Sequence, residues 1–243
     1  MNESFSIIMP VFNAEKTISE SIKSILKQSY PHFVLYIIND SSTDNSKNII
    51  LSFNDSRIVY LETPENSGVA YARNVGIQNA AEKYIAFLDS DDLWLPNKLE
   101  HQLIKLQSGY DVVCSNYFTF NDHGNLNIRK SPIIIKYSQM LKSNFIGNLT
   151  GTYNSTNLGK FFQKKIGHED YVMWLEILKK SEKAFCVQEP LAKYRVSNSS
   201  LSSNKLKVIK WQWLIYRNVL KLSIPKSLFY FSHYLLNALN KRR

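Results

Sequence analysis

Short apolar runs alternate with segments of helical periodicity along the first half of the chain. Each run is long enough for one buried strand. Between the runs, apolar residues recur every three or four positions, as at Ile18, Ile22 and Ile25. This pattern predicts strands at 6–11, 33–38, 58–61 and 84–88, with helices at 15–28, 44–53, 69–80 and 97–108. Alternation of this kind is typical of an α/β protein with a mostly parallel, Rossmann-like sheet flanked by helices.

The second half of the chain is less strongly patterned. The sequence predicts strands at 111–120, 184–188 and 191–196, the last two on either side of Pro190. Glu169 and Asp170 are expected to open a helix that continues over 171–180. Pro96 suits the first position of the fourth helix. The weakly patterned stretch 121–167 is expected to carry substrate specificity, because loops on a rigid scaffold commonly do so.

Composition indicates a globular protein. A chain of 243 residues with 44% hydrophobic and 21% charged residues suits one domain near the upper end of the usual size. Cys114 and Cys186 lack metal-ligand spacing, so we expect reduced thiols in a cytoplasmic setting. The N-terminus lacks a basic segment before its apolar run, and no apolar stretch reaches the roughly 18 residues of a membrane-spanning helix.

The positive charge is concentrated in the C-terminal tail. Of the net charge of +10, the stretch 201–243 contributes nine basic residues and no acidic ones. Two helices are expected there, at about 204–222 and 226–240, separated at Pro225. The second helix is amphipathic, and this pattern predicts that it lies on an anionic membrane surface rather than in the core. The alternative is docking on the domain itself or on a second subunit. The features that carry this prediction are the apolar and aromatic Leu228, Phe229, Tyr230, Phe231, Tyr234, Leu235, Leu236 and Leu239, and the flanking Lys226, Lys241, Arg242 and Arg243.

Polar residues follow three of the predicted strands, at 10–13, 40–44 and 89–92. In parallel sheets, ligands bind beyond the carboxyl ends of the strands. Asp89, Asp91 and Asp92 place three carboxylates within four residues, and a hard divalent cation would neutralise their repulsion. The alternative is an acidic turn that caps the next helix. Neither a G-x-G-x-x-G nor a Walker loop is present, which disfavours dinucleotide enzymes and ordinary NTPases.

Six motifs occur in a familiar order: IMPVFN at 8–13, INDSSTD at 38–44, SGVAYARN at 67–74, FLDSDD at 87–92, HED at 168–170 and YR at 194–195. In these motifs the chain resembles the family 2 glycosyltransferases of the GT-A fold, the bacterial inverting sugar transferases of surface polysaccharide assembly. The resemblance covers about 4–202. It implies a GT-A-type catalytic domain at 1–203, with a nucleotide-sugar half at 1–110 and an acceptor half at 111–203, followed by a helical basic tail at 204–243.

The resemblance also implies roles for individual residues. Asp40 would accept a hydrogen bond from the nucleobase, and Asp91 of the D-x-D motif would bind Mg²⁺ or Mn²⁺, with Asp92 as the alternative metal ligand. Asp170 would be the general base, and Glu169 would raise its pKa or orient the acceptor. The nucleotide-sugar would contact Pro10, Val11, Phe12, Asn13, Asp40, Ser42, Arg73, Asp89, Ser90, Asp91 and Arg195.

The implied function is metal-dependent, inverting transfer of one sugar from a nucleotide-sugar, most simply a UDP-sugar. The acceptor would be a hydroxyl of a glycan or lipid-linked molecule in O-antigen, capsule or other surface polysaccharide synthesis, at the inner face of the cytoplasmic membrane. No nucleic-acid partner is expected. Ser197 stands where many relatives have a histidine, and the Q-x-x-R-W motif of processive synthases is missing. A nucleotidyltransferase would need a glycine-rich loop after the first strand, and a non-enzymatic membrane or polyanion-binding module would leave the carboxylates unexplained.

Overall fold

The computed structural model describes residues 3–196 and 205–240. Its strands form one ten-stranded sheet whose main path runs β3-β2-β1-β4-β9-β6-β10-β5, with β7 added to β6 and β8 added to β10. The strands are β1 (Phe5–Val11), β2 (Phe33–Asn39), β3 (Ile58–Glu62), β4 (Tyr84–Phe87), β5 (Leu93–Trp94), β6 (Val112–Asn121), β7 (Gly124–Arg129), β8 (Ile134–Lys136), β9 (Thr152–Asn154) and β10 (Lys183–Arg195).

Nine α-helices are present in the described part of the chain. They are α1 (Ile18–Leu26), α2 (Ser46–Leu51), α3 (Val69–Asn79), α4 (Lys98–Gln107), α5 (Tyr137–Met140), α6 (Ser155–Leu158), α7 (Glu169–Ser181), α8 (Lys205–Leu214) and α9 (Ile224–Asn240). A 3₁₀ turn, η1 (Asn148–Thr150), precedes β9, and a π-helical turn, η3 (Ile215–Val219), continues α8.

The first four strands confirm the predicted parallel arrangement. β1 lies between β2 and β4 and is parallel to both, and β2 is parallel to β3. β9 then joins β4 to β6 with antiparallel pairing on each side. Pro10 pairs with β2 at a point beyond the last β1–β4 pair, so its missing N–H removes no ladder bond there. The sheet is therefore mostly parallel on its N-terminal side and mixed beyond β4.

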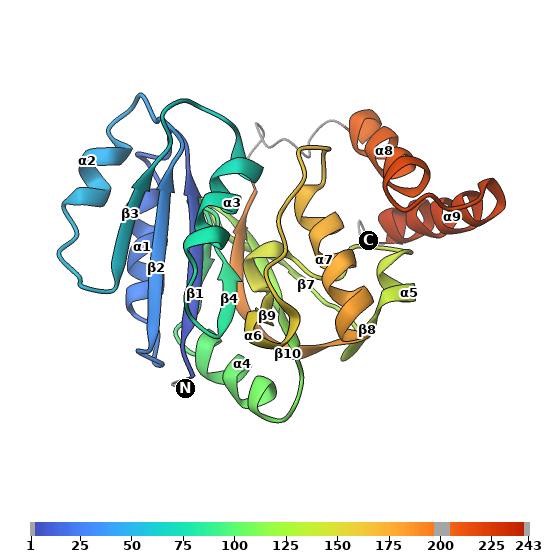
Figure 1. The fold of residues 1–243 in the computed structure, drawn as a ribbon, viewed down its shortest axis with the longest axis horizontal. Helices are drawn as coiled ribbons and strands as arrows, with labels where there is room; N and C mark the ends of the chain where they lie inside the picture. The colour runs from blue at the N-terminus through green and yellow to red at the C-terminus, as the bar shows by residue number, and fades with distance from the viewer. Residues whose placement is uncertain (1–2, 197–204, 241–243) are drawn as a thin grey trace.

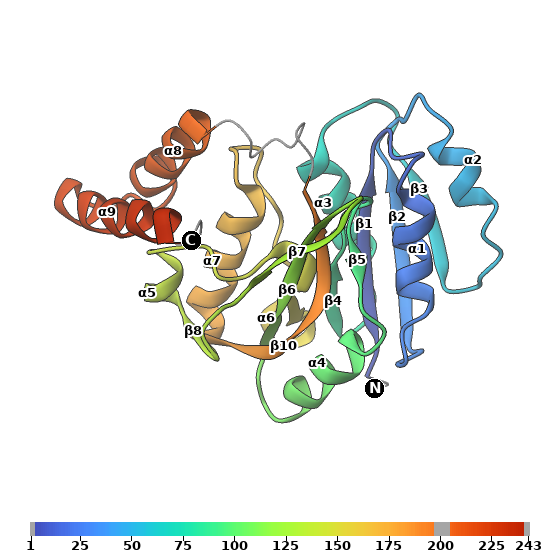
Figure 2. The ribbon, with the colours of Figure 1, turned by 180° about the vertical axis from the view of Figure 1, so that it is seen from behind.

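Helices cover both faces of the sheet. Alternate β1 residues face opposite sides, with Ile7 and Met9 packed among residues of α1 and α4, and Ile8 packed toward α3 and α7. Figure 1 shows α3 and α7 in front of the sheet, and Figure 2, seen from behind, shows α1 and α4 on the opposite face. A Cβ at Gly76 would overlap the side chains of Ile8 and Ile38, which explains a glycine inside α3.

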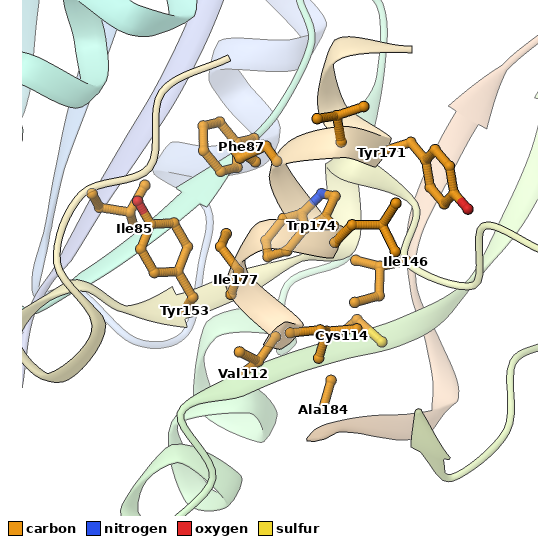
Figure 3. Packing of buried hydrophobic residues seen from close by; sticks show 14 of the residues in the cluster. Ile85, Phe87, Val112, Cys114, Ile146, Tyr153, Tyr171, Trp174, Ile177 and Ala184 are labelled. Atoms are coloured by element: carbon orange, nitrogen blue, oxygen red, sulfur yellow. The ribbon is translucent and has the colours of Figure 1, made fainter. Parts of the chain in front are cut away.

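Helix α7 is fixed by the fully buried side chain of Trp174. Its ring makes edge-to-face contacts with Phe87 of β4 and Tyr153 of β9, at centroid distances of 6.0 and 6.1 Å (Figure 3). Its Nε1 donates to Asn148 Oδ1 at 3.2 Å. Because Trp174 lies one helical turn after Asp170, this packing sets where the start of α7 lies.

Two element boundaries correct the sequence predictions. Helix α4 begins at Lys98 rather than at Pro96, because Leu93 and Trp94 form β5 and pair with β10, and Pro96 lies in the turn that follows. The two strands expected around Pro190 are one strand, β10, whose register against β6 shifts on each side of Pro190. Both corrections come from long-range pairing that local periodicity does not encode.

The C-terminal tail is helical, as expected, but it contacts the domain. Pro225 lies inside the first turn of α9, where a missing N–H removes no helical bond. Tyr230 and Phe231 pack against the core cluster, as the docking alternative requires, and the contact of the tail with a membrane stays a prediction. None of the helices in the described stretches is long and apolar enough to cross a membrane. Ser197 and residues 241–243, which entered the sequence predictions, lie outside the described residues.

Candidate active site

The loops after β1 and β2 are bonded to each other at the edge of the sheet. Asn13, with a positive φ of 48°, accepts a hydrogen bond at Oδ1 from the Thr43 backbone N–H at 2.8 Å. The Asn13 N–H donates to Ser42 Oγ at 3.1 Å. Pro10 and Val11 are buried beneath this contact, whereas 48% of Phe12 is exposed. The loops thus form a rigid ledge on which the Phe12 ring is available to a ligand.

Asp40 lies at the carboxyl end of β2 and is buried. Its Oδ1 accepts hydrogen bonds from Thr63 Oγ1 at 2.8 Å and the Ser67 N–H at 3.1 Å, and its Oδ2 accepts from the Gly68 N–H at 2.8 Å. Asp40 therefore holds the loop that leads into α3. The structure thus gives Asp40 a structural role before α3, and its expected contact with a nucleobase stays a prediction.

Arg73 of α3 connects the strand ends to α7. Its guanidinium, with an 8% exposed side chain, donates through Nη2 to Asp89 Oδ1 at 2.6 Å and through Nη1 to Gln163 Oε1 at 3.1 Å. Burial alone would lower the pKa of Arg73, but Asp89, Asp170 and Glu169 together raise it. The structure therefore brings Asp89, Asp170 and Glu169 around one buried cation, as the predicted site requires.

The carboxylates of the loop after β4 differ in their exposure to solvent. Thr17 Oγ1 and Ser21 Oγ of the α1 region both donate to the Ser90 carbonyl at 2.9 Å, which fixes the loop against that helix. Asp91 is exposed, whereas Asp92 is 1% exposed and accepts the Arg195 backbone N–H at Oδ1 at 2.8 Å. Of the two predicted metal ligands, Asp91 is the one that a solvent ion can reach directly.

Electrostatic repulsion remains within this loop. Although Asp91 is exposed as a residue, protein atoms crowd its carboxyl group, and this desolvation together with the charge of Asp89 raises its pKa. Burial, followed by repulsion from Asp91 and Asp89, raises the pKa of Asp92 well above its usual value. An added cation would relieve this repulsion.

Arg195 at the end of β10 is largely occupied by protein groups. Its Nη1 and Nη2 form ion pairs with Asp122 at 3.0 Å and Glu20 at 2.9 Å, and its Nε donates to the Asp91 carbonyl at 3.0 Å. The guanidinium lies over the Phe120 ring. Arg195 therefore positions the backbone of the D-x-D loop, while its predicted contact with the nucleotide stays a prediction.

Asp170 lies in the first turn of α7, near Arg73. Burial raises its pKa, Arg73 and His168 oppose that effect, and Asp89 adds to it. Glu169 was expected to raise the pKa of Asp170, but burial is the leading cause in the structure. The Glu169 Oε1 accepts a hydrogen bond from the Gly167 N–H at 3.3 Å. A raised carboxyl pKa suits a group that takes a proton near neutral pH.

The segment before α7 is shaped by the tail. Gly167 and His168 both have positive φ, at 78° and 54°, and a Cβ at Gly167 would overlap the Trp211 ring. Trp211 of α8 also meets the His168 ring edge-to-face at 5.4 Å. Trp211 therefore packs against the two residues that precede the acidic pair.

Sequence reasoning missed Tyr117 and Gln163. Tyr117 of β6 lies within electrostatic reach of Asp92 and Asp170, and burial is the main cause that raises its pKa to about 12. Gln163 Oε1 accepts a hydrogen bond from Arg73 Nη1 at 3.1 Å. The Gln163 backbone N–H donates to Asn74 Oδ1 at 2.7 Å, and its carbonyl accepts from Asn74 Nδ2 at 2.8 Å. Gln163 belongs to the weakly patterned stretch 121–167 and Tyr117 to a predicted strand, and the roles of both depend on contacts with distant elements.

The oxygen donors of the site suit a divalent cation whose coordination is completed by a bound ligand. No cluster of three or more potential metal-ligating side chains is present in the part of the chain that the structure describes. Asp91 and its neighbour Asp89 supply hard oxygen atoms at the mouth of the site. Mg²⁺-type ions commonly take one or two carboxylates plus substrate phosphates. The residues therefore fit an ion that is shared with a diphosphate.

Comparison with solved structures confirms the GT-A-type fold. Residues 1–349 of S. aureus TarS, solved in complex with UDP, superimpose with a TM-score of 0.73 at 20% identity, covering 96% of this chain and 70% of that chain. At this identity the match establishes the fold alone.

Sequence relatives and a family model establish the family. Two E. coli proteins, WfgD and WfaP, both named UDP-Glc:alpha-D-GlcNAc-diphosphoundecaprenol beta-1,3-glucosyltransferase, are 39% and 36% identical to this chain. The first alignment covers 97% of this chain and 94% of WfgD, and the second covers 90% and 86%. The model of glycosyl transferase family 2 matches residues 6–164. The chain therefore belongs to glycosyl transferase family 2 and is a glycosyltransferase.

Proposed function

We propose that this glycosyltransferase moves a single sugar from a UDP-sugar to a hydroxyl group of a lipid-linked acceptor, with inversion at the anomeric carbon, in the synthesis of a cell-surface polysaccharide. The observation that carries the proposal is the position of Arg73. This one buried guanidinium contacts Asp89 at the carboxyl end of β4 and interacts electrostatically with Asp170 and Glu169 at the start of α7. Groups suited to a donor and to an acceptor therefore face a common site.

The donor side is formed by the loops after β1, β2 and β4. Phe12 offers an exposed ring for stacking against a base, and the Asn13–Ser42 contact holds the ledge beneath it. Asp91, with Asp89 beside it, would hold Mg²⁺ or Mn²⁺ together with the diphosphate. A bound divalent ion would stabilise the charge that develops on a nucleoside diphosphate leaving group. UDP is proposed because the names of WfgD and WfaP specify UDP-Glc.

The acceptor side is formed by α7 and the elements after β5, in the proposed acceptor half at 111–203. Asp170 would accept the proton from the acceptor hydroxyl as that oxygen attacks the anomeric carbon. Attack opposite the leaving diphosphate inverts the configuration. Burial raises the pKa of Asp170, which favours proton uptake, and the charges of Arg73 and His168 oppose that rise. Glu169 is proposed to orient the acceptor.

The acceptor is proposed to be attached to a lipid, so the enzyme would work on the cytoplasmic surface of the membrane. The names of WfgD and WfaP specify a diphosphoundecaprenol-linked acceptor. In this chain, α9 leaves Ile224, Leu228 and Leu236 between 55% and 58% exposed, along one side of the helix. Those apolar side chains and the basic tail suit the headgroup region of anionic lipid.

Replacement of Asp91 by alanine tests the donor proposal. In the wild type, UDP with Mn²⁺ should raise the melting temperature, and sugar should be released from one member of a panel of nucleotide sugars. Asp91→Ala should fold but lose the Mn²⁺-dependent shift. Asp122→Ala removes a 91% exposed carboxylate that pairs with Arg195 and is not a predicted metal ligand, and it should keep the shift. Equal shifts in Asp91→Ala and the wild type would remove Asp91 from the proposed metal site.

A further inference from the structure

A groove lies between α5 and α9, outside the catalytic site. Its volume is about 470 Å³, within the range of roughly 300–1,000 Å³ that is usual for small-molecule sites. Figures 1 and 2 both show α5 between α7 and α9, and Asn237 Nδ2 of α9 donates to the Lys142 carbonyl at 3.1 Å. The groove is lined mainly by Tyr137, Leu141, Leu222, Lys226, Phe229 and Tyr230.

The groove combines an apolar wall with positive charge. Phe229 remains 52% exposed and packs against the rings of Tyr230 and His233. Lys226 is part of the lining, and Lys142 Nζ lies 5.6 Å from the centroid of the Phe229 ring. Neither lysine forms an ion pair with any residue that the structure describes. The two segments that form the groove belong to the stretches 123–168 and 201–243, which contain no Asp or Glu.

Hydrogen bonds connect one wall of the groove to the start of α7. Tyr171, the residue after Asp170, donates through its hydroxyl to the Met140 carbonyl of α5 at 2.7 Å. Tyr216 of η3 donates to the neighbouring Leu141 carbonyl at 2.6 Å. One wall of the groove is therefore bonded both to the helix that carries the proposed base and to the tail. A molecule extending from the groove toward Asp170 would follow this wall.

We propose that this groove binds the first part of the isoprenoid chain of the lipid-linked acceptor, with Lys226 and Lys142 beside the acceptor's phosphate groups. This inference rests on the proposed function and specifies where its acceptor is held. An apolar chain joined to a diphosphate matches a groove whose described lining is aromatic and aliphatic, includes Lys226 and contains no acidic residue, with Lys142 nearby. The exposed Ile224, Leu228 and Leu236 of α9 do not line the groove and are left free to contact the bilayer.

Binding of soluble probes to the full-length protein tests the groove without the donor. Farnesyl diphosphate, farnesol and inorganic pyrophosphate would each be titrated calorimetrically in EDTA, so that no divalent ion supports binding at the donor site. The wild type should bind farnesyl diphosphate more tightly than either of the other probes. Phe229→Ser should weaken farnesyl diphosphate binding about tenfold, or about 1.4 kcal/mol. Lys226→Gln should weaken farnesyl diphosphate binding but leave farnesol binding unchanged.

Phe162→Ser is the matched control, because Phe162 is 46% exposed and does not line the groove. It should bind farnesyl diphosphate as the wild type does. Equal affinities in Phe229→Ser and Phe162→Ser would overturn the proposal. The proposal would also be overturned if the wild type were a dimer that does not bind farnesyl diphosphate and Phe229→Ser were a monomer. The groove would then be an interface between copies of the chain. Release of sugar from UDP-sugars, measured separately, tests the proposed function, so either idea can fail alone.

Discussion

Arg73 is the most informative position to perturb, because both halves of the proposed site depend on it. Arg73→Met keeps an apolar side chain in place but leaves Asp89 without its partner. Removing one member of a buried ion pair typically costs about 3–5 kcal/mol of unfolding free energy. The Asp89 side chain is 33% exposed, so water can partly replace the guanidinium, and we expect a loss of about 3 kcal/mol, near the lower end of that range. For a chain of this size, that loss lowers the melting temperature by about 6–12 °C.

Two measurements check this expectation. Thermal unfolding of Lys164→Met provides the control, because Lys164 also forms a 2.6 Å ion pair, with Glu176, but its side chain is 57% exposed. Surface pairs contribute at most about 1 kcal/mol. In addition, Arg73 opposes the raised pKa of Asp170, so its loss should move the acidic limb of the kcat profile to higher pH. If Arg73→Met melts no lower than Lys164→Met and its pH profile is unshifted, Arg73 does not connect the two halves of the site.

Three further predictions follow from the carboxylates and the tail. Asp170→Asn should bind UDP and Mn²⁺ normally but lose about 10²- to 10⁴-fold in kcat, and near-normal turnover would exclude Asp170 as the base. Because the pKa of Asp92 is raised in the fold, its contribution to the stability of the ligand-free protein should be lost as pH rises above about 4, so urea unfolding should show Asp92→Asn gaining stability relative to the wild type over that range; a constant difference would refute this. The double variant Leu228→Ser, Leu236→Ser should co-sediment less with anionic liposomes at low salt than Leu51→Ser, Ile104→Ser, which alters equally exposed residues on α2 and α4; equal partitioning would count against the membrane role of α9.

The parallel part of the fold could be predicted because its signals are local. The apolar runs that became β1, β2, β3 and β4 are flanked by helical periods, and their polar ends meet because parallel strands end at the same edge of a sheet. Beyond β4, pairing is set by distant segments. Leu93 and Trp94 look like the approach to a helix until β10 supplies the strand that they pair with.

The same limit applies to the site. Three neighbouring carboxylates at 89–92 predict a ligand-binding loop, but their spacing does not say which of them points into the protein. That choice is made by Arg73, which pairs with Asp89, and by the Arg195 backbone, which binds Asp92. Asp91 is left exposed at the site by these two contacts. Tyr117 and Gln163 were missed for the same reason, because only the folded chain brings them to the site.

Helix α7 makes the proposed catalytic site dependent on both the core and the tail. Trp174 fixes the helix in the core, Asp170 and Glu169 occupy its first turn, and Tyr171 bonds α5 beside the groove. Trp211 packs on Gly167 and His168, immediately before the acidic pair. A lipid-linked acceptor that bound α9 and the groove would therefore contact elements that are packed against the start of α7, where the proposed base lies. Transfer to a lipid-linked acceptor should consequently need the tail even where donor binding does not, because α8 and α9 touch the acceptor side of the site and the donor loops lie across the sheet.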